Sequence, residues 1–314
     1  MNNNQKLLPY IMNKQLVILL IALCSFFTST AQQNPQYTQY MYNMNVVNPA
    51  YAGSHEALSI GTLYRDQWSG LDGAPKTFTF NAHTPFGENV GLGISVIADK
   101  IGPVKEQNLN VDYAYKIKLG GEHRLAFGIK AGATFNNIGL TGIVVDNAED
   151  PAFSSDVTDT YLNIGAGVYY YTNRYYVSFS VPAILKSKHL DVNGRTYGSN
   201  VQHYFLTAGY VFQLSQNLKF KPSAMLKSAF SAPTSLDVNA NFLFFDRLEL
   251  GASYRLDDSF SGMVNFAVTP GIRIGYAYDH IISDIREAAT ASHEVFLQFD
   301  IPYGSKVYRS PRYF

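Results

Sequence analysis

The chain has 314 residues, with 24 Lys and Arg against 24 Asp and Glu, so its formal net charge is zero. A neutral chain lacks a basic footprint, which argues against nucleic acid as a partner. Charged residues make up only 15% of the chain, whereas Tyr, Phe and Gly number 23, 21 and 24. This composition favours β structure and argues against both a helical bundle and a disordered chain.

The first 31 residues have the pattern of a signal peptide. Lys14 precedes an apolar run over residues 16–27, and small residues follow up to Ala31. The run is too short to span a bilayer comfortably, so we expect cleavage after Ala31, with Met12 as an alternative start. An anchored N-terminus is the other interpretation. The only cysteine, Cys24, lies in this run, so the mature chain would contain no disulfide and no cysteine metal ligand.

From residue 56 onward, apolar and polar residues alternate with period two. In the segment from Leu125 to Phe135, for example, one face carries Phe127 and Ile129, and the other carries Gly128 and Lys130. Two-faced strands mostly of 8–13 residues suit a transmembrane barrel, whose strands need about 9–11 residues. The predicted strands begin near Leu58, Thr77, Val90, Leu109, His123, Thr160, Tyr175, His203, Leu218, Ser235, Leu248, Ser259, Ile272 and Ser292.

The connections between these strands alternate in length. Those after even-numbered strands are short, and those after several odd-numbered strands are long, namely 67–76, 99–107, 136–159, 182–202 and 281–291. Outer-membrane barrels have short periplasmic turns and longer outer loops. The sequence therefore predicts an all-β, transmembrane antiparallel barrel of about 14 strands in the outer membrane, with both mature termini in the periplasm.

The polar faces of the strands should line the lumen. Both charge signs occur there, which favours structural ion pairs that hold the interior closed over a selectivity filter. The charged residues predicted to point inward are Lys130, Lys219, Lys221, Lys227, Asp237, Glu249, Arg255, Arg273, Asp279 and Glu294.

A search for catalytic and metal-binding patterns finds none. The seven histidines form no His-Glu-x-x-His pair, and no Gly-x-Ser-x-Gly motif occurs. Gly91, Gly93, Gly165 and Gly167 lie inside strands, where they would keep one face small. The acidic loop 136–159 matches no calcium loop, and attraction to the basic residues of loop 182–202 is the simpler account. We expect no enzyme activity, no cofactor and no metal.

The N-terminal motif resembles the opening of the PorP/SprF family of Bacteroidetes outer-membrane proteins. Gln39-Tyr40-Met41 and Asn48-Pro49-Ala50-Tyr51-Ala52-Gly53 match the family pattern directly, and Arg65-x-Gln67-Trp68 matches a second one. Asn34 stands where the family usually has Asp, and Tyr37-Thr38 replaces Phe-Ser. The resemblance then continues as a strand pattern over the mature chain. The motif residues, candidates for a plug or a partner contact, are Gln39, Tyr40, Met41, Asn48, Pro49, Ala50, Tyr51, Gly53, Arg65, Gln67 and Trp68.

Membership of this family implies an accessory role in the type IX secretion system. Such a barrel would assist the secretion or surface anchoring of cargo with a C-terminal sorting domain, including adhesins of gliding motility. The implied partners are this cargo, other components of the system and outer-membrane lipids. The alternative is a diffusion porin or a transporter of small hydrophobic solutes, and an outer-membrane hydrolase is a third possibility.

Residues 34–53 are too polar to cross lipid, and Pro35 and Pro49 make them poor partners for a strand. Their aromatic side chains need cover, which the barrel interior or its periplasmic rim would supply; a disordered tail is the alternative. We therefore divide the chain into a signal peptide (1–31), an N-terminal motif segment (32–55) and an outer-membrane barrel (56–314), and we expect the motif segment to be plug-like.

Overall fold

The computed structural model describes residues 35–142, 155–185, 191–192, 195–196, 202–229 and 232–303. The predicted signal peptide lies outside these residues. So do most of the acidic residues of loop 136–159 and the basic residues Lys186, Lys188 and His189 of the neighbouring loop.

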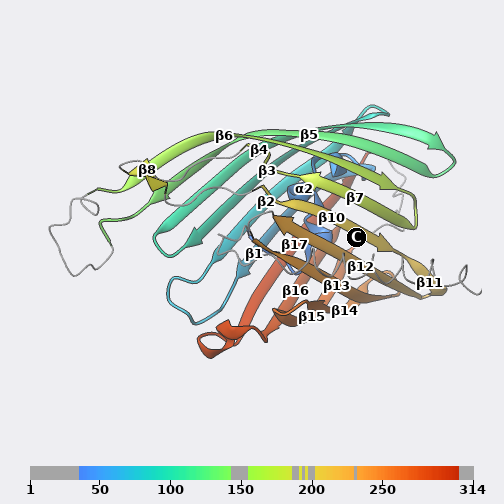
Figure 1. The fold of residues 1–314 in the computed structure, drawn as a ribbon. Coiled ribbons are helices and arrows are strands. Elements are labelled where there is room, and N and C mark those ends of the chain that lie inside the picture. The colour runs from blue at the N-terminus through green and yellow to red at the C-terminus, as the bar shows by residue number, and fades with distance from the viewer. Residues whose placement is uncertain are drawn as a thin grey trace, which may run out of the picture.

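Antiparallel strands close into a barrel, because the first strand pairs with the last one (Figure 1). The main sheet has fifteen strands, but β10 and β11 pair with successive parts of β12 and share one place, so the described wall has the fourteen strands predicted. In ring order they are β1 (Ala57–Asp66), β2 (Lys76–Phe86), β3 (Val90–Ile101), β4 (Val104–Gly120), β5 (His123–Ile138), β6 (Val157–Tyr171), β7 (Tyr175–Val181), β10 (Tyr204–Tyr210) with β11 (Phe212–Ser215), β12 (Leu218–Ala229), β13 (Ala232–Phe244), β14 (Leu248–Arg255), β15 (Ser259–Thr269), β16 (Ile272–Ile281) and β17 (Ala291–Pro302).

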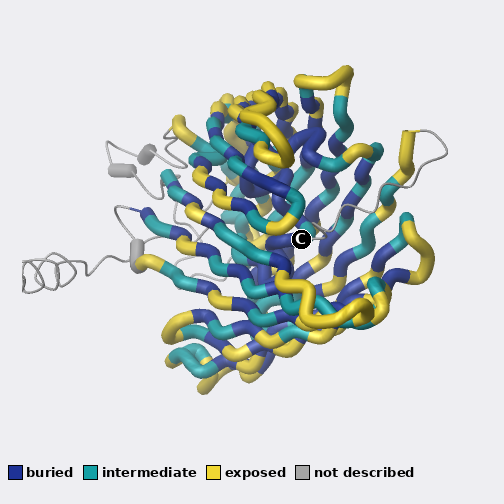
Figure 2. Tube along the Cα trace, turned by 90° about the vertical axis from the view of Figure 1, so that its right-hand side faces the viewer, coloured by how far each residue is buried: buried dark blue, intermediate teal, exposed yellow. Residues whose placement is uncertain are grey.

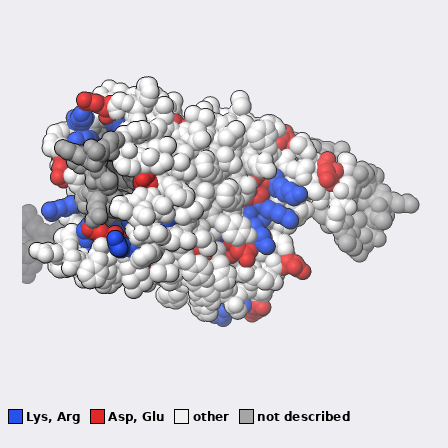
Figure 3. All heavy atoms as spheres, turned by 180° about the vertical axis from the view of Figure 1, so that it is seen from behind, with Lys and Arg blue, Asp and Glu red and all other residues white. Residues whose placement is uncertain are grey.

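Each strand has an apolar outer face and a polar inner face. On β5, Phe127 and Ile129 are 47% and 60% exposed, whereas Gly128 and Lys130 are buried. Figure 2 shows the alternation along the strands, and Figure 3 shows that most charged side chains lie toward the two ends of the barrel. An apolar outer band with a polar interior is the pattern of a barrel in lipid. No helix within the described residues is long and apolar enough to span a membrane.

Short turns join the strands at one end of the barrel, and most long connections lie at the other. The short turns follow β2, β4, β6, β11, β13 and β15, as predicted. The long connections follow β1, β5, β7 and β16; the one after β7 holds the small hairpin β8 (Asp191–Val192) and β9 (Arg195–Thr196), and the one after β16 holds η5 (Asp284–Glu287).

One predicted loop is wrong. Residues 99–107 form a hairpin with a tight turn, because Ile101 pairs with Val104 and Lys100 pairs with Lys105. The strand β4 therefore begins at Val104, earlier than the predicted Leu109. After Val104, the next four residues (105–108) are all polar or charged, so the period-two apolar signal is missing although the strand pairing continues.

The N-terminal segment crosses the inside of the barrel. It contains three short turns of helix, η2 (Tyr40–Tyr42), α2 (Met44–Val47) and η3 (Pro49–Tyr51). Figure 1 shows this blue segment surrounded by strands of the wall. Its side chains contact strands on opposite sides of the ring, from β2 to β13.

Candidate functional site: the N-terminal segment in the lumen

The segment from Tyr37 to Ser54 is almost completely buried. Gln39, Tyr40 and Asn48 have no exposed surface, and only Tyr42 is half-buried. The segment therefore lies inside the barrel, and the alternatives of a rim position and a disordered tail are wrong for the described residues. We call residues 35–54 the plug segment.

Asn48 fixes the second half of the plug segment to the wall. Its Oδ1 accepts from the Ala50 N–H at 2.9 Å, which caps the short helix η3. Its Nδ2 donates to the Val168 carbonyl at 3.1 Å and to the Ser178 Oγ at 2.7 Å. Pro49 occupies the first helical position, where its missing N–H costs nothing. The Asn-Pro-Ala sequence thus forms a capped turn that is anchored to β6 and β7.

Glycines of the wall allow the plug segment to approach the strand backbone directly. A Cβ at Gly128 would lie 2.1 Å from the Ala50 nitrogen, and a Cβ at Gly91 would lie 1.9 Å from the Ala52 oxygen. A Cβ at Gly167 would similarly lie 2.0 Å from the Oδ1 of the capping asparagine. Gly91 and Gly167 keep the inner face small, as predicted, and all three glycines make room for the plug segment.

Gly53 ends the motif in a conformation and a space that suit only glycine. Its φ of +65° lies in the left-handed region, and a Cβ would lie 2.6 Å from the Gly91 Cα. Its carbonyl accepts from the Lys116 Nζ at 2.8 Å, and its N–H donates to the His83 Nδ1 at 3.3 Å. The end of the plug segment is therefore fixed to β2 and β4.

Arg65 holds the start of the plug segment through two acidic residues. Its guanidinium lies 2.7 Å from Asp279 and 3.2 Å from Glu294, and all three side chains are buried. The Glu294 carboxylate accepts hydrogen bonds from the backbone N–H groups of Thr38 and Gln39 at 2.9 and 2.7 Å. The Thr38 hydroxyl donates to Asp279 at 2.8 Å. The motif residue Arg65 thus orients the carboxylates that bind the plug segment.

A second buried ion pair binds the middle of the plug segment. The Lys221 Nζ lies 2.7 Å from Glu249, and Arg273 lies 3.6 Å from the same carboxylate. The Tyr42 hydroxyl donates to Glu249 at 2.6 Å, and its ring stacks on Phe296 at 4.5 Å. Burial and the Glu249 charge raise the pKa of Tyr42 well above its ordinary value, so its phenol stays protonated as a donor.

Two further ion pairs complete the lining. Lys130 lies 2.9 Å from Asp112, which also accepts from the Asn45 amide at 3.1 Å. Arg255 lies 2.7 Å from Asp237. Breaking a buried pair of this kind typically costs about 3–5 kcal/mol. The predicted ion pairs of the interior are confirmed by these contacts. Nine of the ten predicted lining residues are buried, and Lys219 lies nearer the end of the barrel, 2.5 Å from Asp246.

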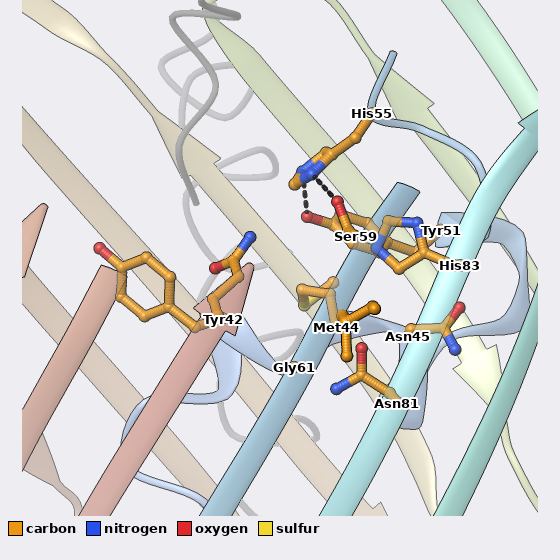
Figure 4. A pocket seen from close by; sticks show the side chains of 11 residues that line it. Tyr42, Met44, Asn45, Tyr51, His55, Ser59, Gly61, Asn81 and His83 are labelled. Carbon is orange, nitrogen blue, oxygen red and sulfur yellow. Dashed lines mark hydrogen bonds between the residues drawn. The ribbon is translucent and has the colours of Figure 1, made fainter. Parts of the chain in front are cut away.

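A small pocket remains between the plug segment and strands β1, β2 and β17, and His55 and Ser59 lie in its lining (Figure 4). Asp300 does not line the pocket but contacts both of these side chains. The Ser59 Oγ donates to Asp300 at 2.5 Å and lies 2.8 Å from the His55 Nδ1. The Tyr51 hydroxyl lies 2.8 Å from the His55 Nε2. In a catalytic triad the serine and the acid contact opposite ring nitrogens. Here both lie on the Nδ1 side, so the arrangement differs from a triad.

No local motif marks this cluster, because Ser59 and Asp300 are 241 residues apart. They become neighbours only where β1 pairs with β17, which sets Ser59 opposite Asp300. Their inward-facing positions on the first and last strands are the signal that could have found them. Among the described residues, no group of three His, Cys, Asp or Glu side chains could hold a metal ion.

Gln67 and Trp68 lie apart from the plug segment, in the connection between β1 and β2. The backbone N–H of Trp68 donates to the Ser292 Oγ at 3.0 Å, and the backbone N–H of Ser69 donates to the Ala291 carbonyl at 2.8 Å. Trp68 is half-buried and has a positive φ of 55°, which is uncommon for a bulky residue. The motif residues therefore form two groups, one in the lumen and one in the loop beside the start of β17.

Comparisons with known proteins agree with this architecture. Residues 29–299 match the family described as type IX secretion system membrane protein PorP/SprF. The sequence matches no curated protein. The fold is similar to the Ralstonia pickettii toluene transporter TbuX (11% identity, TM-score 0.51, 85% of this chain and 94% of that chain) and to the CymD monoaromatic hydrocarbon channel (12% identity, TM-score 0.50, 86% and 94%). Identities this low show the barrel fold alone.

Proposed function

Because the chain belongs to the PorP/SprF family of type IX secretion system membrane proteins, we propose that it is an accessory barrel that assists the secretion or surface anchoring of a cargo protein. The cargo carries a C-terminal sorting domain, as adhesins of gliding motility would. Family membership implies association with other components of the system, and the barrel fits the outer membrane.

The observation that carries this proposal is the occupied lumen. The plug segment is bound by Asn48, by Gly53 and by the two carboxylates beside Arg65, so protein fills space that a diffusion pore would leave to water. The similarity to a toluene transporter and a hydrocarbon channel is limited to the fold. It therefore does not favour the alternative of a porin or a solute transporter.

The proposed role is binding and anchoring, without bond chemistry. The Ser59, His55 and Asp300 cluster supports this, because a tyrosine occupies the ring nitrogen that a catalytic serine would need. The loop that carries Trp68 is the natural partner contact, since binding residues often lie on loops held by a rigid scaffold. In this arrangement the long connections face outward and both mature termini lie in the periplasm.

Affinity purification from the native outer membrane tests the proposal. The chain, tagged at its C-terminus, is crosslinked in cells, and the proteins that co-purify are identified by mass spectrometry. We expect type IX components together with a surface protein bearing a C-terminal sorting domain. An unrelated barrel of the same membrane, tagged in the same way, is the control. Deletion of the gene should also remove that surface protein. A barrel that purifies alone, and whose loss leaves surface proteins unchanged, would overturn the proposal.

A further inference from the structure

Three lysines stand side by side across neighbouring strands of the wall. Lys76 on β2 pairs with Lys100 on β3, which pairs in turn with Lys105 on β4. All three are exposed. They lie at the barrel end that carries most of the long connections, at the last or next-to-last paired positions of these strands.

The strand alternation places this row on the outer surface. Lys76 shares its face with Phe78, which is 43% exposed, whereas Thr77 between them is buried. Lys105 shares its face with Leu109, which is 50% exposed. The lysines therefore border the apolar band of the barrel, at the depth where the headgroups of a lipid leaflet begin.

Acidic side chains leave most of this positive charge unbalanced. The Lys76 Nζ lies 3.8 Å from Asp66, the one ion pair of the row within the described residues. Asp99 and Glu106, the sequence neighbours of the other two lysines, lie on the inner face, where Asp99 accepts from Thr77. Asp156 forms no ion pair with Lys105 within the described residues, and its carboxylate accepts a hydrogen bond from the Thr141 hydroxyl at 2.8 Å. Like charges directly opposite each other destabilise a sheet, so binding of an external anion would stabilise this row.

The row continues with neutral polar side chains. Lys105 pairs with Asn137 on β5, which pairs with Thr158 on β6, and the Asn137 amide donates to the Thr158 hydroxyl at 3.0 Å. Neighbouring strands lie about 4.8 Å apart, so the three lysines span roughly 10 Å. Three amines beside two groups that bond to hydroxyls suit a phosphorylated sugar better than a simple phosphodiester.

We propose that Lys76, Lys100 and Lys105 bind the phosphate groups of a glycolipid headgroup of the lipid A class in the outer leaflet. This site goes beyond the proposed role in secretion and rests only on the outward orientation of the long connections. The lysines supply charge-assisted bonds to phosphate, and Asn137 and Thr158 contact the sugar hydroxyls.

Binding is measured with the purified full chain and nanodiscs that contain lipid A. In the test variant, Lys76, Lys100 and Lys105 are all changed to Gln. Because each cation near an anionic surface contributes about fivefold, we expect the affinity to fall on the order of 100-fold. The control changes three exposed cations at the opposite end, Lys118, Arg174 and Arg247, to Gln, with the same loss of charge. It should stay within about twofold of the unchanged chain.

Three results would overturn the site. One is an equal loss of affinity in both variants, which would mean diffuse attraction. Another is equal binding to nanodiscs containing phosphatidylglycerol in place of lipid A, which would mean any anionic lipid. The third is displacement of the lipid by millimolar inorganic phosphate, which would mean a free-anion site. If the triple variant fails the heat-modifiability test for folding, the single change Lys100→Gln should still weaken lipid A binding about fivefold, and an unchanged affinity would refute the site.

Discussion

Gly128 illustrates how single residues of the wall decide whether the lumen can be filled. Because Ala50 lies where a side chain would begin, the change Gly128→Ala forces the Ala50 backbone away from β5. Overpacking of this kind typically costs about 1–3 kcal/mol. We expect a lower urea midpoint of unfolding, together with faster proteolysis of the plug segment in the folded barrel.

Gly262 provides the matched control for this change. It lies on the exposed face of β15, and a Cβ there would meet no atom within 4 Å. The change Gly262→Ala should leave both the midpoint and the proteolysis rate unchanged. If Gly128→Ala behaves in the same way, the close approach of Ala50 does not hold the plug segment in place.

Trp68 separates a partner contact from a structural role. If it contacts cargo, the change Trp68→Ala should leave the barrel at normal levels in the membrane while the partner adhesin disappears from the surface. If it locks the loop to β17, barrel abundance or heat-modifiability should fall first. Quantitative blots of barrel and adhesin on the same cells distinguish the two. Normal levels of both proteins would show that Trp68 has neither role.

The motif residues could be found in the sequence, but their contacts could not. The segment of residues 34–53 stands out because it is polar, contains two prolines and lies in front of regular strands. Arg65 orients Glu294 for the plug segment only because β1 pairs with β17. In this pairing the two residues lie opposite each other. Local sequence carries no information about a partner 229 residues away.

At the scale of elements, the strands could be predicted because lipid imposes a strict alternation of apolar and polar residues. The start of β4 could not be predicted, because the residues from Lys105 onward are polar on both faces of the strand up to Leu109. The same reasoning explains why β5 and β6 reach further into their connection than predicted, to Ile138 and from Val157. Hydrophobic periodicity reports where a strand meets lipid, and not where its hydrogen bonding ends.

The two ends of the barrel should differ in their access to the cell exterior. We expect single cysteines replacing Asp72 or Glu287, in long connections, to react with an impermeant maleimide on intact cells. Cysteines replacing Glu88 or Glu122, in short turns, should react only after the outer membrane is opened. All four positions are exposed, so burial does not explain a difference. Labelling of the short turns on intact cells would reverse the orientation.

For the whole molecule, the closed barrel, its charged interior and a plug-like N-terminal segment could be predicted from the sequence, whereas the contacts that hold this segment in the lumen required the structure. The plug segment stays inside because polar groups of the wall and the segment satisfy each other at many points around the ring. Three of these contacts are hydrogen bonds from the plug segment to buried, ion-paired carboxylates, namely Glu249, Glu294 and Asp112. Without the plug segment, these carboxylates would lack part of their hydrogen bonding. Segment and wall therefore form one polar core within an apolar shell.

Single-channel recording in planar bilayers tests this account most directly. The mature chain is compared with a variant that lacks residues 35–53, after both are shown to be heat-modifiable barrels. We predict that the mature chain conducts little and that the deletion raises the conductance to that of an open pore, because water replaces the plug segment. A mature chain that already conducts as an open pore, or a deletion that folds and stays closed, would contradict the account.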